Sequence, residues 1–109
     1  MFSIVYVTAS SMEEARKIAR TLIEKKLAAC VNLWPIESIY RWDGIQEENE
    51  VAMIIKTTYE QLGNIEQTVK EMHSYTVPCI LSLSIDGGSI EYLDWIDDNV
   101  MPARFFIKE

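Results

Sequence analysis

The chain has 109 residues, 49% of them hydrophobic and 25% charged, which is the composition of one ordinary globular domain with a single core. Its 10 basic and 17 acidic side chains give a formal charge of -7, and this charge repels phosphate backbones and anionic lipid surfaces. The composition therefore argues against nucleic acid and membrane partners.

A strand and a helix are the first elements expected along the chain. Phe2 to Ala9 is almost continuously apolar, which predicts a strand in the centre of its sheet. Ser11 and Glu14 then form a capping box, S-x-x-E, and apolar residues follow at the spacing of an amphipathic helix. We expect this helix to end near Lys25 and Lys26, whose charges suit its negative C-terminal end.

A long hairpin is predicted in the middle of the chain. Ala28 to Trp42 is rich in β-branched and aromatic residues, and Pro35 marks a bend or an edge position. Asp43 and Gly44 suit a two-residue turn, because both positions need positive φ, and Glu48 to Thr58 is the expected return strand. The first arm would reach roughly 50 Å if straight, more than twice the length of a typical strand.

The far half of this hairpin is too long for one small domain to cover. We expect its apolar side chains to project into solvent or to lie on another copy of the chain, and burial of apolar area favours the second arrangement. The residues concerned are Ile39, Tyr40, Trp42, Val51 and Met53.

The second half of the chain supplies another helix and strand, followed by two shorter elements. Thr58 and Gln61 form a weaker capping box before a helix that carries the stripe Leu62, Ile65, Val69 and Met72. Cys79 to Asp86 is expected to be a strand with one polar face and one buried face, made by Leu81, Leu83 and Ile85. Ser89 is expected to cap a short third helix, and the last short strand is predicted at Arg104 to Ile107.

The order of these elements indicates the fold class. A β-α-β-β-α-β order with an added C-terminal helix and short strand is typical of an α+β, ferredoxin-like sandwich. We expect residues 1–109 to form one domain of this kind.

Several segments, in order and over nearly the whole chain, resemble the CutA divalent-cation-tolerance proteins. They are LAACVN (27–32), SIYRWDG (38–44), Glu50, IKT (55–57), HSYTVP (73–78) and YLDWI (92–96). The resemblance implies a homotrimer of ferredoxin-like subunits, similar to the PII signalling proteins, in which long hairpins pair with neighbouring sheets. It also implies a link to copper tolerance, and similar animal proteins are associated with a scaffold role, the anchoring of acetylcholinesterase.

The chain departs from the family's pattern around His73. Family members often read H-P-Y-E-x-P-E where this chain reads HSYTVPC, so two carboxylates beside the histidine are missing. Some bacterial members proposed to bind copper use a first-strand cysteine and adjacent histidines, where this chain has Val7 and Met72. Of that copper-binding pattern, His73 alone is present.

Three residues are the candidate metal ligands: His73, Cys79 and Cys30. His73 is the one histidine and has two interpretations, a cap or hydrogen-bonding group at a helix end, or a ligand. Cys79 lies six residues beyond it, across a proline-containing turn. Cys30 is expected to point into the core. We therefore expect a divalent cation such as copper to be held weakly.

The candidate ligand-binding residues are Tyr40, Trp42, Lys56 and Tyr75. Tyr40 and Trp42 have two interpretations, packing between subunits or stacking on a ligand. Lys56 ends an apolar run and either reaches solvent or is held for an anion. Tyr75 lies two residues after His73 in the sequence.

Two functions remain open from the sequence. The first is a trimeric cytoplasmic protein that binds a cation or small ligand in clefts between subunits, and the second is a non-catalytic scaffold with no dedicated ligand. We expect no enzymatic activity, because the chain has no nucleophile elbow, HExxH motif or phosphate loop. The cytoplasmic location is expected because no leader-like segment opens the chain and no ~20-residue apolar span occurs in it.

Overall fold

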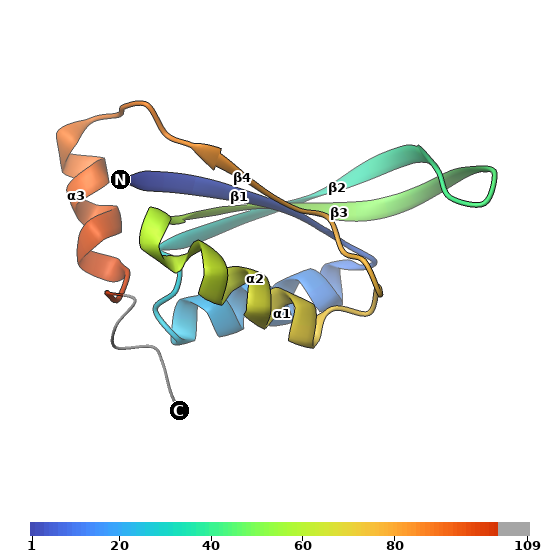
Figure 1. Cartoon of the computed structure of the whole chain (residues 1–109), viewed down its shortest axis with the longest axis horizontal. Coiled ribbons are helices and arrows are strands. Elements are labelled where there is room, and N and C mark those ends of the chain that lie inside the picture. The colour runs from blue at the N-terminus through green and yellow to red at the C-terminus, as the bar shows by residue number, and fades with distance from the viewer. Residues whose placement is uncertain (103–109) are drawn as a thin grey trace.

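The computed structural model describes residues 1–102 and has one four-stranded antiparallel sheet, with the first two helices on one of its faces and the last helix at one end (Figure 1). The expected α+β, ferredoxin-like arrangement is confirmed, with α3 appended after the last strand. The predicted strand at Arg104 to Ile107 lies outside the described residues. In chain order the elements are β1 (Phe2–Ala9), α1 (Met12–Glu24), β2 (Cys30–Arg41), β3 (Ile45–Thr58), the 3-10 helix η1 (Tyr59–Gln61), α2 (Leu62–Met72), β4 (Ile80–Ser84) and α3 (Ile90–Asn99).

The strands lie in the order β2-β3-β1-β4, so β1 is an interior strand, as its apolar sequence predicts. Its neighbours β3 and β4 both run antiparallel to it, with Val7 opposite Met53 on one side and Ile80 on the other. The strand β2 lies at the edge of the sheet, where Pro35 loses no ladder hydrogen bond to a further strand.

The first helix begins as predicted, but its capping box is only half formed. Ser11 is the N-cap, and its side chain accepts the backbone N–H of Glu14. The Glu14 carboxylate does not return to Ser11; it accepts hydrogen bonds from Ser10 and Ser74 instead. The helix ends at Glu24 with Lys25 as C-cap, where the sequence places its end.

The capping box predicted for the second helix is wrong. Thr58 precedes the short helix η1 and makes no side-chain cap hydrogen bond. Gln61 is fully buried, and its amide donates to the carbonyl of Met101. Gln61 therefore makes a tertiary contact with the segment after α3 in place of the cap hydrogen bond that the local pattern predicts.

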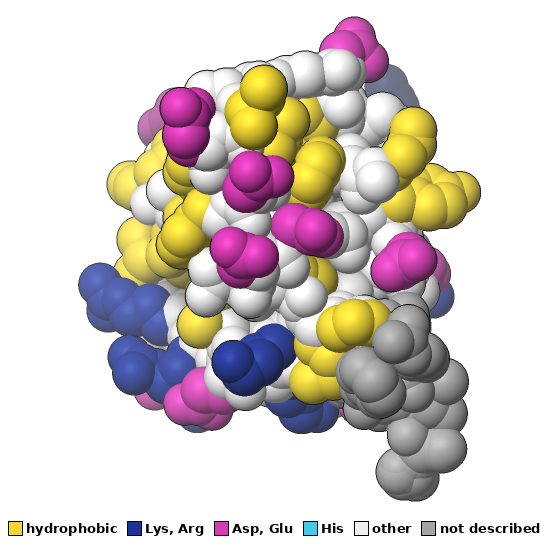
Figure 2. Space-filling view, turned by 90° about the vertical axis from the view of Figure 1, so that its left-hand side faces the viewer, with side chains coloured by type: hydrophobic (Ala, Val, Ile, Leu, Met, Phe, Trp, Pro, Cys, Tyr) yellow, Lys and Arg dark blue, Asp and Glu magenta, His cyan; other side chains and the backbone are white. Residues whose placement is uncertain are grey.

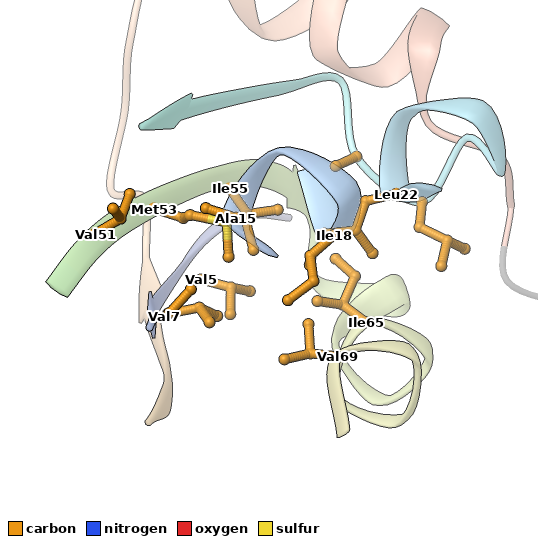
Figure 3. Close-up of a cluster of buried hydrophobic side chains, with 13 residues drawn as sticks. Val5, Val7, Ala15, Ile18, Leu22, Val51, Met53, Ile55, Ile65 and Val69 are labelled. Carbon is orange, nitrogen blue, oxygen red and sulfur yellow. The ribbon is translucent and has the colours of Figure 1, made fainter. Parts of the chain in front are cut away.

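The main core lies between the sheet and the helices α1 and α2 (Figure 3). Val51 and Met53 are buried in it, so the prediction that they lie on the uncovered part of the hairpin is wrong. The reason is the register, because β1 reaches as far as Ala9 opposite Val51 and keeps both residues under the helices. The main contributors to this cluster are Val5, Val7, Ile18, Leu22, Ile55, Ile65 and Val69.

The hairpin projects beyond the helices, and its outer part is uncovered (Figure 1). Ile39 is 71% exposed and Trp42 is 62% exposed, as expected for a segment that one subunit cannot cover. The expected positive φ is found at Asp43 (54°) and Gly44 (95°). The predicted two-residue turn is wrong, because Arg41 pairs with Ile45 and leaves three residues in the loop.

The sheet face opposite α1 and α2 is largely uncovered, and this overturns the prediction for β4. Leu81 and Leu83 were expected to be buried, but they are 59% and 54% exposed. They pair with Tyr6 and Ile4 of β1 on the face opposite the helices. Among the helices of residues 1–102, none is long and apolar enough to cross a bilayer.

The hairpin loop gives a test of its backbone geometry. Replacing Gly44 with alanine is expected to destabilise the chain by about 1 to 2 kcal/mol, because a side chain is strained at positive φ even where space is free. Chemical denaturation of both proteins measures this difference. Gly87→Ala is the matched control, since Gly87 is equally open and lacks positive φ. Equal stability of the Gly44→Ala variant and the original chain would contradict the strained-loop assignment.

Candidate functional site

A groove of about 930 Å³ lies between the hairpin and the segment that joins α2 to β4. One wall comes from residues 36–40 and Trp42, the other from residues 74–77 and Cys79, and Tyr6, Thr8 and Glu50 complete the lining. Four predicted site residues meet here: Tyr40, Trp42, Tyr75 and Cys79.

Tyr75 and Glu50 form a partly buried polar contact in the groove. The Tyr75 hydroxyl donates to Oε2 of Glu50 over 2.7 Å, and Glu50 is only 8% exposed. Burial, together with this hydrogen bond, raises the pKa of Tyr75 well above its ordinary value, so the phenol stays a neutral donor. Glu50 was not predicted as a site residue. It lies on β3 opposite Ile36 of β2, the strand that also carries Tyr40.

A second tyrosine makes a similar contact nearer the hairpin tip. The Tyr40 hydroxyl donates to Oε1 of Glu48 over 2.9 Å, between positions that are diagonal neighbours on β2 and β3. The hydrogen bond to Glu48 is the main reason that the pKa of Tyr40 is raised. Both tyrosine hydroxyls of the groove wall are therefore already committed to carboxylates.

His73 lies behind the groove as the C-cap of α2, and its ring is fully buried. The backbone N–H of Tyr75 lies 3.0 Å from Nδ1 and can only donate, so Nδ1 accepts. Nε2 then carries the proton and donates to the carbonyl of Thr8 over 2.7 Å. With both ring nitrogens engaged, the arrangement favours the structural interpretation of His73 over the ligand interpretation.

Glu14, near the start of α1, binds the backbone of Ser74 in the groove wall formed by residues 74–77. Its carboxylate accepts from the backbone N–H and hydroxyl of Ser10 and, over 2.6 Å, from the backbone N–H of Ser74. Burial alone raises the pKa of Glu14, but these hydrogen bonds outweigh it and lower the pKa to about 2. The capping-box pattern identified Glu14, but no local signal pointed to Ser74, which is 60 residues away.

The two cysteines lie in different places. Cys79 is half-buried in the groove lining, and burial raises the pKa of its thiol although a hydrogen bond with Thr8 opposes this. Cys30 is also half-buried and lies opposite Lys56 in the register. The expectation that Cys30 points into the core is wrong, because its neighbour Val31 packs there and adjacent strand residues face opposite sides.

Lys56 lies away from the groove. Its amino group donates to the Tyr92 hydroxyl over 3.2 Å and lies 5.3 Å from the centre of the Tyr92 ring. Tyr92 in turn packs against Trp95 on α3, with ring centres 5.4 Å apart. Lys56 therefore links β3 to α3, and within one subunit it does not join the other predicted ligand-binding residues.

The residues present do not fit a resident metal site. Across residues 1–102 there is no group of three or more His, Cys, Asp or Glu side chains placed to hold a metal ion. Of the three predicted ligands, Cys79 lines the groove, His73 lies behind it with both nitrogens engaged, and Cys30 lies elsewhere on the sheet.

Comparison with known proteins gives consistent matches. Residues 3–99 match the family model described as CutA1 divalent ion tolerance protein. The chain is 52% identical over 101 residues to the divalent-cation tolerance protein CutA of Archaeoglobus fulgidus, covering 92% of this chain and 99% of that protein.

Solved structures agree with the sequence matches. The structure of the periplasmic divalent cation tolerance protein CutA from Archaeoglobus fulgidus has a TM-score of 0.91 and 51% identity, covering 93% of this chain and all (100%) of that one. The divalent cation tolerance protein from Thermus thermophilus has a TM-score of 0.90 and 45% identity, covering 93% and 100%.

The low pKa of Glu14 predicts a pH dependence of stability. Because the folded pKa of about 2 lies below the ordinary 4.5, the stabilisation is fully present above pH 4.5 and is lost as the pH falls toward 2. Glu14→Gln is expected to lower the free energy of unfolding at pH 7 by about 1 to 3 kcal/mol and to flatten its acid dependence.

Denaturation at several pH values, with the exposed neighbour Glu13→Gln as control, measures this effect. The assignment fails if Glu14→Gln and Glu13→Gln have the same stability profile.

Proposed function

Because this chain belongs to the CutA1 divalent ion tolerance family, we propose that it acts as a homotrimer that binds a cation or small ligand in clefts between its subunits. The observation that supports this most is the groove, which gathers Tyr40, Trp42, Tyr75 and Cys79 beside the uncovered hairpin. Ligand sites commonly form in such concave regions between subunits or domains.

The uncovered sheet face supports a trimer. Leu81 and Leu83 of β4 and Trp34 of β2 are all exposed on it in the single chain. Both edges of the sheet, β2 and β4, also present strand backbone with no neighbour among the described strands. Another subunit would bury the apolar side chains and cover these edges, which single chains rarely leave open.

The end of the molecule near α3 adds to this uncovered surface. Figure 2 shows acidic and apolar side chains interspersed there. Ile90, Tyr92 and Trp95 are exposed among Asp94 and other acids of the same helix. A neighbouring subunit would shield the aromatic side chains while the acidic ones kept the assembly soluble.

A divalent cation would be held weakly in this groove. Cys79 and Glu50 are among the potential donors that line it, and the raised pKa of the Cys79 thiol disfavours the thiolate that binds metals. A cation such as copper would therefore exchange readily. Rapid exchange suits a protein that buffers the concentration of free cation better than one that needs a metal ion for its structure.

We also propose that the protein has no catalytic activity. Tyr40 and Tyr75 are neutral donors already paired with carboxylates, and the thiol of Cys79 is held in the protonated form. His73 has no free nitrogen with which to act as a base. These features favour binding over bond-making chemistry.

The second candidate function is a trimeric scaffold with no dedicated ligand. The exposed apolar face of Leu81, Leu83 and Trp34 favours it, because assembly alone would account for those residues. Mass spectrometry of compounds retained by the purified trimer separates the two functions: a stoichiometric small molecule supports ligand binding, and an empty trimer supports the scaffold.

A cytoplasmic location is part of the proposal. The two free thiols, Cys30 and Cys79, suit a reducing compartment. The Archaeoglobus fulgidus structure is named periplasmic, so fractionation of cells that express this chain is the direct test.

Assembly through the uncovered sheet face can be tested with one charge. Light scattering is expected to give three chains per particle, and Leu83→Asp is expected to dissociate them, because the change would bury a carboxylate without a partner. Ile23→Asp, an exposed apolar position on the helix layer, is the control and is expected to stay trimeric. A monomeric original chain, or a trimeric Leu83→Asp variant, would rule out this interface.

Weak metal binding gives a further test. The protein is expected to stay folded and trimeric in chelator, and copper(II) is expected to bind with a Kd of roughly 1 µM or weaker, because few donors converge in the groove. Calorimetric titration measures the affinity, with Cys79→Ser to remove the thiol donor. Tight, stoichiometric copper that is unaffected by Cys79→Ser would place the metal elsewhere.

A further inference from the structure

The groove is negatively charged and has no positive side chain in its lining. Glu37 and Glu50 are among its lining residues, and none of those residues is lysine or arginine. Glu48, whose carboxylate accepts the hydroxyl of Tyr40, adds negative charge next to the lining. An anionic ligand would meet repulsion here without any cation to offset it.

Glu50 is the group with the strongest need for a positive partner. It is 8% exposed, and its one hydrogen bond from residues 1–102 is that of the neutral Tyr75 hydroxyl to Oε2. Oε1 has no hydrogen-bond partner among the described residues, and since no fully buried side-chain oxygen there lacks one, Oε1 keeps some contact with solvent. A largely desolvated carboxylate with one neutral donor and one oxygen without such a partner favours a cation.

The rest of the lining suits an organic ligand. Tyr40 and Tyr75 have their hydroxyls committed to carboxylates, so they offer the groove mainly ring surface. Trp42, Ile39 and Val77 add apolar surface. Aromatic rings attract ammonium groups through their π-electrons, and attract them more strongly where water is excluded.

The dimensions also favour an organic cation over a bare metal ion. A volume of about 930 Å³ lies within the range of small-molecule sites, which is roughly 300 to 1,000 Å³. A metal ion would instead need several donors converging on one point, and residues 1–102 contain no such group.

We propose that this groove binds a small organic cation, with its ammonium group at Oε1 of Glu50 and its apolar body against the rings of Tyr40, Tyr75 and Trp42. The proposal rests on the proposed function, since it names the ligand class for the same groove. It also makes Glu50 the residue that selects the charge of the ligand.

A charge series on the unmodified full-length chain tests this. The probes are 2-phenylethylammonium, its neutral counterpart 2-phenylethanol and the anion 3-phenylpropanoate, titrated by calorimetry at low salt. The ammonium is expected to bind at least about tenfold more tightly than the alcohol, and the anion is expected not to bind. Equal affinity for the three probes, or no binding of the ammonium up to millimolar concentration, would overturn the proposal.

A matched pair of variants locates the site. Glu50→Gln keeps an oxygen that accepts the Tyr75 hydroxyl but removes the charge, and it is expected to weaken ammonium binding about tenfold or more. Glu47→Gln, on the same strand but outside the groove lining, is expected to leave the affinity unchanged. Equal losses in both variants would show a diffuse effect of charge and would overturn the role of Glu50. If Glu50→Gln does not fold, the charge series still decides the proposal.

Light scattering and copper titration on the same sample separate this inference from the proposed function. A trimer that binds copper but does not prefer the ammonium overturns the organic-cation inference alone. A monomer that binds neither copper nor the ammonium overturns both.

Discussion

Two helices on one side of a four-stranded sheet cover only that side, and the rest of the structure follows from this constraint. The core forms between α1, α2 and the sheet, so the opposite face keeps Leu81 and Leu83 in contact with water. The hairpin extends past the end of the helices, so its tip is uncovered on both sides (Figure 1). The groove lies where this uncovered tip faces the segment between α2 and β4.

The position of that segment depends on a network of hydrogen bonds around Glu14 and the buried ring of His73. Glu14 at the start of α1 holds the backbone of Ser74, and the buried ring of His73 joins Thr8 of β1 to the backbone of Tyr75. Three elements therefore meet behind the groove wall. The network places Tyr75 so that its hydroxyl reaches Glu50, and the chemistry of the groove thus depends on residues outside its lining.

Local signals predicted most of the fold. The apolar run of β1, the serine cap of α1 and the positive φ of Asp43 and Gly44 each depend on near neighbours in the sequence, and each is found as expected, although the loop has three residues and not two. The second capping box failed because Gln61 bonds to Met101, a contact that no window around Thr58 contains.

The strand register and the choice of sheet face that the helices cover could not be predicted from near neighbours in the sequence. Alternation in β4 indicates two unlike faces but does not say which one the helices cover, so Leu81 and Leu83 were assigned to the wrong one. Length counted from the turn placed Val51 and Met53 on the free hairpin, whereas the extent of β1 decides their burial.

The candidate site shows the same division between local and distant information. Tyr40, Trp42, Tyr75 and Cys79 were singled out by residue type, and the fold brings them together. Their chemistry depends on Glu50, which contributes through its burial and its contact with Tyr75, a residue 25 positions away. A glutamate in an acidic stretch looks like a solubilising residue until the fold shows that it is desolvated. Its carboxylate then has one neutral donor and one oxygen without a partner among the described residues, and the proposed preference for a cation rests on this imbalance.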